Sequence, residues 1–256
     1  MIPLLRTLLR GTPFYHSAAR IYHACRRLIM RAKLLFSNVR YLPPVHPKGN
    51  YKSQFGQDYH LEKLGLVGLN GFFVEIGSNH PVDNSNSYYL EEHLGWAGVS
   101  IDGVDFSKQF KEFRPNTIFI NCLIDTKNGE AEFFEVHSVT GWESQISSLY
   151  EKNLDLGKGF TADKKIVRTR RLSDIAEIDR QIDVCLIDVE GHEFSVLESI
   201  DWQARAPKVF VIENMGEFYP REQLTTFMRD KGYKFVARIG VTDDIFLSKD
   251  FTPTRP

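Results

Sequence analysis

Two short segments hold acidic side chains at points where the chain turns. EIGSN at 75–79 leaves an apolar run and turns at Gly77, and DVEGHE at 188–193 follows another apolar run. A third acid, Asp102, ends the next apolar run along the chain, at 98–102. Carboxylates in such places accept hydrogen bonds from hydroxyl groups, take up protons or bind cations.

These acids depend on an alternation of strands and helices. Glycine at position 77 permits a tight turn and a close approach of ligand to backbone. Short runs rich in β-branched and aromatic residues predict buried strands, and the segments between them predict helices. Such alternation predicts an α/β fold, a doubly wound and mostly parallel sheet. We expect strands at 72–76, 98–102, 117–122, 183–188 and 208–213, helices at 84–94, 106–113, 172–178, 192–200 and 220–231, and a terminal antiparallel hairpin within 233–248.

The acids at the strand ends suggest a nucleoside ligand without phosphates. Ligands of open parallel sheets bind beyond the carboxyl ends of the strands, where Asp102 is placed to accept both hydroxyls of a ribose. The turn after Gly77 reads Ser78, Asn79, His80, so the glycine pattern that binds a pyrophosphate is missing, and no phosphate loop is present. S-adenosylmethionine fits these features, whereas a nicotinamide dinucleotide fits them poorly.

Longer stretches support this interpretation by resemblance. FFVEIGSNHPVDNSNSYYLEEHLGWAGVSID at 72–102 and IDVCLIDVEGHEFSVLESIDW at 182–202 resemble the two main motifs of the FkbM-type methyltransferases. The resemblance covers about 53–250 and implies a Rossmann-like class I methyltransferase fold, with a seven-stranded sheet that ends in the hairpin. It also implies S-adenosylmethionine as cofactor and an O-methyltransferase that acts on a hydroxyl of a glycan or related metabolite.

The resemblance assigns roles to individual residues. Those expected at the cofactor are Glu75, Gly77, Ser78 and Asn79 for the methionine end, Asp102 for the ribose, and Asn121 and Cys122 for the adenine, with Asp125 a weaker candidate. Two positions depart from the family pattern. Pro81 stands where a second glycine is frequent, and Gly103 stands where a proline commonly follows the acid.

A hydroxyl acceptor must lose its proton, and DVEGHE offers the groups to receive it. We expect Asp188, Glu190 and His192 to be catalytic. The alternatives are that Glu190 and Glu193 are first-turn acids of a helix and that His192 is a solvated residue at its start. Glu213 and Asn214 end the last parallel strand and could orient acceptor hydroxyls. No ligand spacing in the sequence demands a metal ion, so none is predicted.

Charge is divided unevenly along the 256 residues. The net charge is -1, but the ten basic residues of 1–57 meet no acid before Asp58. The acidic remainder argues against nucleic acid as a partner. Three widely spaced cysteines predict reduced thiols, hence a reducing, cytoplasmic compartment.

The basic residues belong to an amphipathic helix in a predicted arm at 1–40. RIYHACRRLIMRAKLLF at 20–36 places apolar residues on one face and Arg and Lys on the other. Three interpretations remain open: a helix on anionic lipid at the inner face of a membrane, a helix docked on the domain or a partner, and a mitochondrial transit peptide. The proline-rich segment 41–52 predicts a linker, and 53–256 the methyltransferase domain.

A second hypothesis comes from a different class of protein. Pro81 fixes its own φ and lacks an N–H, which would remodel the cofactor turn. A methyltransferase-like scaffold that the arm brings to membranes, with weak or no catalysis, is therefore the alternative to the enzyme.

Overall fold

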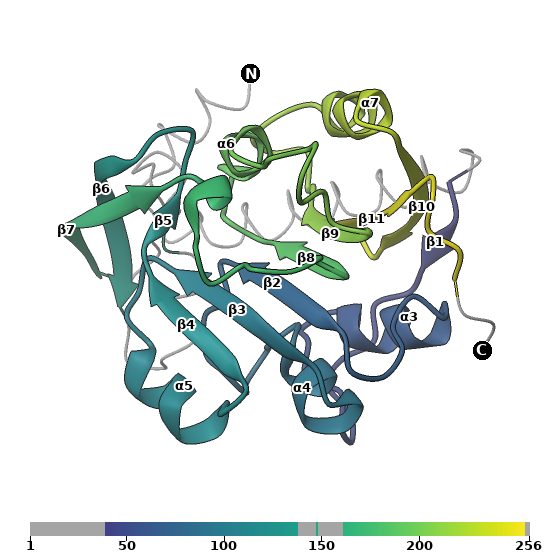
Figure 1. Ribbon diagram of the computed structural model, residues 1–256, viewed down its shortest axis with the longest axis horizontal. Coiled ribbons are helices and arrows are strands. Elements are labelled where there is room, and N and C mark those ends of the chain that lie inside the picture. Colours follow the sequence, from purple (N-terminus) through teal and green to yellow (C-terminus); the bar gives the residue numbers. More distant parts are fainter. Residues whose placement is uncertain (1–38, 138–146, 148–160, 254–256) are drawn as a thin grey trace, which may run out of the picture. The chain divides into compact units, whose positions relative to one another are not determined.

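The five apolar runs form the parallel centre of one sheet. The computed structural model describes residues 39–137, 147 and 161–253. Its main sheet has eight strands in the order β1-β10-β11-β9-β8-β2-β3-β4 (Figure 1). Strand β2 pairs in parallel with both β3 and β8, and β9 pairs in parallel with β8. The doubly wound, mostly parallel sheet predicted from the sequence is therefore confirmed.

The elements follow the chain in a regular alternation until the terminal hairpin. Their bounds are β1 Tyr41–Leu42, α3 Gln57–Lys63, β2 Phe72–Ile76, α4 Tyr88–Leu94, β3 Ala97–Asp102, α5 Ser107–Phe113, β4 Thr117–Asn121, β5 Leu123–Ile124, β6 Gly129–His137, β7 Thr161–Arg170, η3 Leu172–Asp174, β8 Val184–Ile187, α6 Glu193–Glu198, β9 Val209–Glu213, α7 Arg221–Asp230, β10 Tyr233–Ile239 and β11 Asp243–Ser248.

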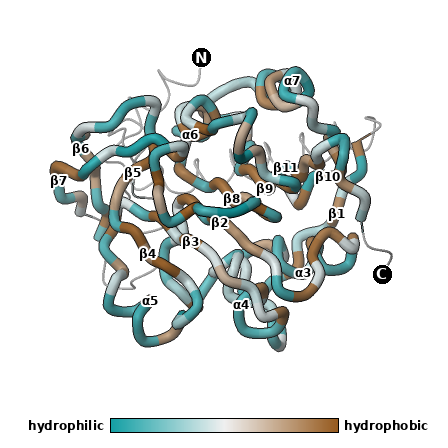
Figure 2. Tube along the Cα trace, viewed as in Figure 1, coloured by the Kyte–Doolittle hydropathy of each residue, from teal (hydrophilic) through white to brown (hydrophobic). Residues whose placement is uncertain are grey.

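Both faces of the sheet carry a hydrophobic core. Because successive strand residues point to opposite faces, Phe72, Val74 and Ile76 pack with residues of α6 and α7. Phe73 packs on the other face with residues of α3 and α4. Figure 1 shows these helix pairs on opposite sides of the sheet, and Figure 2 shows apolar residues gathered along the central strands. This double burial explains why the strands are continuously apolar.

The hairpin predicted at the end of the chain is confirmed. Strand β11 pairs antiparallel with both β10 and β9, so it inserts between the hairpin partner and the parallel strands. The turn between β10 and β11 thereby reaches the carboxyl end of β9, where Asp243 lies opposite Glu213.

Residues 41–52, expected to be a linker, contribute the eighth strand. Strand β1 pairs in parallel with β10, and Gly240 N–H donates to the Leu42 carbonyl at 2.9 Å. His60 Nε2 lies 2.9 Å from the Pro43 carbonyl oxygen. Prolines lack an N–H but retain a carbonyl acceptor, so a proline-rich segment can still be held by donors on neighbouring elements. The compact unit of the body begins at Tyr41.

A smaller sheet lies beside the main one. It has the order β5-β7-β6, with β6 and β7 paired antiparallel over their whole lengths. Residues of α5, β5, β6 and β7 form a third hydrophobic cluster. The insertion expected at 137–165 has its ends in β6 and β7, and most of the rest lies outside the described residues, as do the arm residues 1–38.

Two helix predictions differ from the structure. The segment 172–178 contains only the 3-10 turn η3, because Ile175 and Ile178 turn into the core. Helix α4 begins at Tyr88 rather than at 84, since Asn84 has a φ of 58° and the residues before the helix bind buried side chains. None of the described helices has the length and apolar content required to cross a bilayer.

Candidate active site

The candidate site lies at the switch point of the sheet. The chain runs from β2 to β3 and β4 on one side, then returns to β8 and β9 on the other. Loops that leave β2 and β8 therefore diverge, and a ligand crevice forms between them. Gly77 has a φ of 78°, and a Cβ atom built there would lie 1.7 Å from the Asp188 carbonyl oxygen. Only glycine allows this contact between the two loops.

Two cavities open at this crevice. The Asp102 cavity is lined by Ile76, Gly77, Asn79, Ile101, Asp102, Gly103, Cys122, Leu123, Ile124, Phe133, Ser147, Asp188, Val189, Glu190 and His192. The Glu213 cavity, the larger of the two, is lined by Gln54, Phe55, Gln57, Gly77, Ser78, Asn79, Asn84, Asn86, Asp188, Glu190, Glu213, Met215, Thr242 and Asp243. Four residues line both: Gly77, Asn79, Asp188 and Glu190.

Asp102 links the loop after β2 to the end of β3. Its Oδ2 accepts from Asn79 N–H at 2.8 Å, and its Oδ1 accepts from Val104 N–H at 2.8 Å. Burial raises the pKa of Asp102 to about 6, although these backbone donors oppose the shift. The carboxylate is thus fixed in orientation, and it lines the cavity at the place expected for a ribose.

The part of the Asp102 cavity beyond the acid is apolar. Cys122, Leu123, Ile124 and Phe133 form this wall, which suits the flat face of a base. Cys122 is a buried free thiol, as expected, and burial raises its pKa to about 11. Asn121, which was expected beside the adenine together with Cys122, does not line the Asp102 cavity. Its side-chain amide instead donates to the carbonyls of Asp102 and Gly103 at 2.9 and 3.0 Å, which fixes the end of β3.

Glu75 lies outside both cavities. The alternation along β2 places Glu75 on the α4 face of the sheet with Phe73 rather than at the crevice. There its Oε2 accepts from Ser87 Oγ at 2.6 Å, and its Oε1 accepts from Asn86 N–H at 3.2 Å. Burial raises the pKa of this carboxyl despite those donors. Glu75 therefore holds the loop before α4, and the structure does not bring it to the expected cofactor position.

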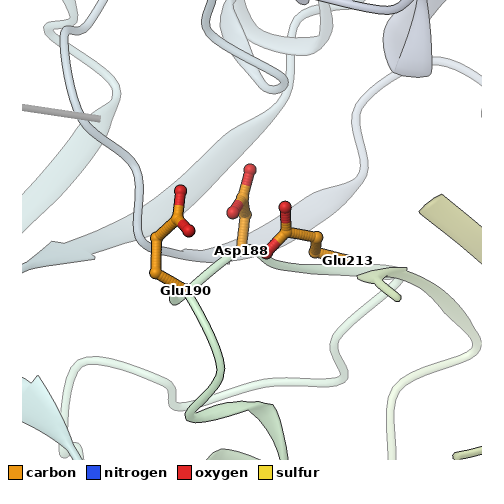
Figure 3. Close-up of side chains that lie close together, drawn as sticks. All are labelled: Asp188, Glu190 and Glu213. Carbon is orange, nitrogen blue, oxygen red and sulfur yellow. The ribbon is translucent and has the colours of Figure 1, made fainter. Parts of the chain in front are cut away.

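Three carboxylates converge where the cavities meet (Figure 3). Asp188 follows β8, Glu190 lies two residues further, and Glu213 ends the neighbouring β9. One carboxylate oxygen from each lies within 4.8 Å of the other two. Burial and then the other carboxylates raise the pKa of Asp188 and of Glu213 well above the usual range. Burial, followed by Glu193 and Glu217, raises the pKa of Glu190 to about 8.

The turn that carries Glu190 is strained. Glu190 has a φ of 51° and Gly191 a φ of 100°. Glu193 Oε1 accepts from Gly191 N–H at 3.0 Å and lies 3.4 Å from Val189 N, so its carboxylate binds the backbone on both sides of Glu190 and holds the turn. A left-handed glutamate persists only where surrounding contacts fix it, and such residues cluster at functional sites. Of the two acids, Glu190 reaches the crevice while Glu193 holds the backbone.

His192 lies on the Asp102 side of the site. It is buried, lines the Asp102 cavity but not the Glu213 cavity, and its Nε2 is 3.4 Å from Asp125 Oδ1. Burial lowers its pKa, although the Asp125 carboxylate opposes the shift. The structure thus places His192 with the residues of the Asp102 cavity rather than with those of the Glu213 cavity.

Sequence reasoning missed the polar wall supplied by distant segments. Thr242 and Asp243 come from the β10–β11 turn, and Gln57 starts α3; the Gln57 amide donates to Asp243 Oδ2 at 3.1 Å. The signal was the pair of acids in TDDIFLS, which opens an apolar strand. Asn214, weighed with Glu213, lines neither cavity and donates to Asp244 Oδ2 at 2.6 Å.

Pro81, which motivated the scaffold hypothesis, also lines neither cavity. Its carbonyl accepts from Arg114 Nη1 at 2.8 Å. Arg114 is fully buried and also donates to Glu91, Ser85, Ser87 and Thr117. The departure from the glycine pattern is therefore accommodated by a loop packed around a buried guanidinium, away from the crevice.

Comparison with known proteins decides the family. The methyltransferase FkbM domain matches residues 75–235, which is more than half of the chain and includes most of the first motif and all of the second. The chain belongs to the FkbM methyltransferase family. It is therefore a methyltransferase, and the resemblance drawn from the two motifs is confirmed. No curated protein matches this FkbM methyltransferase in sequence.

Solved structures of other methyltransferases share little sequence with this FkbM methyltransferase. Precorrin-6y C5,15-methyltransferase from Geobacter metallireducens is 11% identical, with a TM-score of 0.44 over 80% of this chain and 94% of its own. The METTL16 MTase domain is 9% identical, with a TM-score of 0.43 over 87% of this chain and 79% of its own. The human methyltransferase 10 domain containing protein is 10% identical, with a TM-score of 0.41 over 88% and 98%.

Proposed function

We propose that this FkbM methyltransferase transfers a methyl group from S-adenosylmethionine to a hydroxyl of a polyhydroxylated acceptor, a glycan or related metabolite. One observation carries the proposal: two cavities of different character share Gly77, Asn79, Asp188 and Glu190. A donor in one cavity and an acceptor in the other would meet at these residues, so the reacting groups are aligned by the protein.

The Asp102 cavity fits the adenosine part of the cofactor. A fixed carboxylate can accept from the ribose hydroxyls, and the apolar wall around Cys122 and Phe133 can pack on the base. The backbone at Gly77 and Asn79 is where the methionine part would lie. When bound, the cofactor supplies an electrophilic methyl group on a sulfonium, so the protein mainly has to position the acceptor.

The Glu213 cavity fits a polyhydroxylated acceptor because its wall is mostly polar. Within the described residues, three buried polar atoms on this wall have no hydrogen-bond partner: Ser78 Oγ, Asn86 Oδ1 and Glu213 Oε2. Unpaired buried groups cost free energy unless a ligand satisfies them. A sugar, which presents several hydroxyl donors and acceptors, would meet this requirement better than an apolar acceptor.

The carboxylates at the shared edge supply the base. The acceptor oxygen forms the new C–O bond as the C–S bond breaks, and the hydroxyl proton passes to Asp188 or Glu190. Burial raises the pKa of both carboxyls, which makes each a stronger base once ionised. The cofactor then leaves as the neutral thioether S-adenosylhomocysteine.

Calorimetry with S-adenosylhomocysteine tests the cofactor half of this proposal. We expect saturable binding to the full chain, weakened in Asp102→Ala and unchanged in the control Asp105→Ala, whose exposed carboxylate accepts hydrogen bonds from Ser107 and lines neither cavity. Absence of binding to wild type at millimolar ligand would refute the proposal. The acceptor half is tested by transfer of a labelled methyl group to a panel of glycans and polyols, with ring-methylated apolar phenols as the comparison class.

The arm adds a proposal about location that rests on sequence alone. Residues 1–40 hold the basic amphipathic segment, whose Arg and Lys face would attract anionic lipid. A peripheral position at the inner face of a membrane would follow, and a hydroxylated acceptor at that surface would then be within reach.

A further inference from the structure

The three converging carboxylates come from neighbouring strand ends. Ile187 of β8 pairs with Ile212 of β9, so Asp188, the first residue after β8, and Glu213, the last residue of β9, lie side by side at the end of the sheet. Glu190 approaches from the strained turn, and Figure 3 shows all three carboxyl groups directed to the same small region. Three carboxylates with oxygens within 4.8 Å of one another repel strongly in a buried site.

Glu213 provides a second, independent observation. The residue is only 8% exposed, and its Oε2 has no hydrogen-bond partner among the described residues. The Tyr219 hydroxyl lies nearby but donates to the backbone carbonyl of Glu213 at 3.0 Å, not to the carboxylate. A buried carboxylate oxygen without a donor is normally paired or coordinates a metal.

The protein supplies no cation to two of the three acids. Within the described part of the chain, no Lys, Arg or His side chain forms an ion pair with Asp188 or Glu213. The buried guanidinium of the hairpin, that of Arg238, is already paired with Asp244 and with the Asn214 carbonyl. Among the described residues, Asp188 and Glu213 therefore have no positively charged partner, and a bound cation would supply one.

We propose that Asp188, Glu190 and Glu213 bind a divalent cation of the oxygen-preferring class, Mg²⁺, Mn²⁺ or Ca²⁺. All three ligands are carboxylates, which suit hard cations, and no thiol or imidazole belongs to the set. The cation would sit at the boundary of the two cavities, because Asp188 and Glu190 line both.

The position of the cation suggests its role, which rests on the proposed function. An acceptor hydroxyl in the Glu213 cavity could bind the cation directly and so lose its proton more readily. With Asp188 and Glu190 bound to the cation, Asp243 of the cavity wall would take the hydroxyl proton in place of those two acids. The resulting alkoxide would form the new C–O bond as the C–S bond of the cofactor breaks. A second hydroxyl on the neighbouring carbon could occupy another coordination position, which favours vicinal diols as acceptors.

The test measures metal binding alone, on the full chain after treatment with a chelator. Titration with Mn²⁺, followed by the paramagnetic resonance of the free ion, should show one saturable site per chain, and Mg²⁺ and Ca²⁺ should compete for it. Glu213→Gln should weaken Mn²⁺ binding at least about tenfold, since loss of even an outer-shell partner has that effect. The exposed Glu198 of α6 gives the matched control, and Glu198→Gln should bind as wild type.

Equal Mn²⁺ affinity in Glu213→Gln and wild type, or no saturable site at millimolar Mn²⁺, would overturn the inference. The melting temperature of chelator-treated Glu213→Gln should not fall, because the variant removes a repelling charge; if it does fall, Asp188→Asn is measured instead under the same criteria. S-adenosylhomocysteine calorimetry separates the two proposals. If S-adenosylhomocysteine binds in the presence of chelator and no Mn²⁺ site is found, the cation site is rejected and the proposed methyl transfer stands. If Mn²⁺ binds but S-adenosylhomocysteine does not, the proposed methyl transfer is rejected and the cation site stands.

Discussion

At the scale of single residues, Asp102 and Glu190 suit their proposed roles for different reasons. Asp102 is fixed by two backbone donors and presents its remaining lone pairs to a cavity. Glu190 is held in a left-handed backbone conformation that aims its carboxylate at the crevice. The first is useful because it is immobile, and the second because its strain is maintained by Glu193 and the sheet.

Asp102 should make cofactor binding depend on pH. Only the ionised carboxylate accepts from both ribose hydroxyls, and the pKa of Asp102 is raised by burial to about 6. Affinity for S-adenosylhomocysteine should therefore be constant above pH 7 and fall as the pH drops through 6. Calorimetry from pH 5 to 8 measures this, within a range where the chain stays folded by circular dichroism.

The control for that prediction is Asp102→Asn. It should bind weakly at all pH values and show no step near pH 6. A step of the same size in Asp102→Asn would assign the titration to another group.

Glu190→Gly should separate stability from activity. Glycine adopts a φ of 51° without strain, and the substitution removes a buried carboxylate. The free energy of unfolding should therefore rise by about 1 kcal/mol. Methyl transfer should nevertheless be lost, because the carboxylate is gone. Urea denaturation and a methyl-transfer assay measure the two effects.

Asn70 offers a matched comparison for this substitution. It has a φ of 59° but lines neither cavity, so Asn70→Gly should leave methyl transfer unchanged. Full activity in Glu190→Gly would remove Glu190 from the mechanism.

At the scale of elements, two contacts between loops hold the site together. One is the close approach of Gly77 to the Asp188 carbonyl, which joins the ends of β2 and β8. The other is the buried Arg114, which gathers the loop between β2 and α4 around its guanidinium. The first contact sets how closely the loop that carries Asp188 approaches β2, and the second holds the loop before α4.

Gly77→Ala should damage the fold more than other glycine substitutions. Its φ is 78° and the new Cβ would meet the Asp188 carbonyl at 1.7 Å, so the loops must separate. Gly232 has a φ of 90° but no heavy atom within 4 Å of its Cβ position. We expect Gly232→Ala to cost about 1 kcal/mol and Gly77→Ala about 3 kcal/mol or more, measured by urea denaturation. Equal costs would show that backbone strain alone, rather than the loop contact, matters.

Arg114→Ala should destabilise the protein by about 3–5 kcal/mol, because it leaves the buried Glu91 carboxylate without its cation. Arg229 pairs with Asp230 on the exposed side of α7, so Arg229→Ala should change the urea midpoint little. A small effect of Arg114→Ala would mean that the loop before α4 does not depend on the guanidinium.

At the scale of the whole molecule, the folded body already begins at Tyr41, so it includes the segment 41–52 that was expected to be a linker. Strand β1 and the carbonyls of Leu42 and Pro43 are bound by β10, Gly240 and His60. Removal of 1–40 should therefore leave the melting temperature and S-adenosylhomocysteine affinity intact, whereas removal of 1–52 should lower both. Calorimetry on the two truncated chains distinguishes a boundary at 40 from one at 52.

The arm should act separately from the body. The full chain should sediment with anionic vesicles, more weakly at high salt, and the chain without 1–40 should not. Equal sedimentation with neutral and anionic vesicles would reject the electrostatic contact and favour one of the other interpretations of the arm.

The sequence alone determined the order of strands and helices, the parallel sheet and the family. Short β-branched runs are local signals, and the motifs around Gly77 and Asp188 are contiguous, so both survive without coordinates. It also placed Asp102, Asp188 and Glu190 at strand ends, where the switch point of the sheet must gather them. These residues are set by topology, which is a regular consequence of alternation.

Only the tertiary structure decided which strand-end acids face the crevice. Side-chain direction in the last residues of a strand depends on the alternation of faces and on partners distant in sequence, which is why Glu75 is held by Ser87 instead. Likewise Thr242 and Asp243 reach the Glu213 cavity because β11 inserts beside β9, and Gln57 of α3 joins them through its hydrogen bond to Asp243. The carboxylate cluster also depends on strand pairing: Glu213 is distant in the chain from Asp188 and Glu190, and the pairing of β8 with β9 brings it beside them.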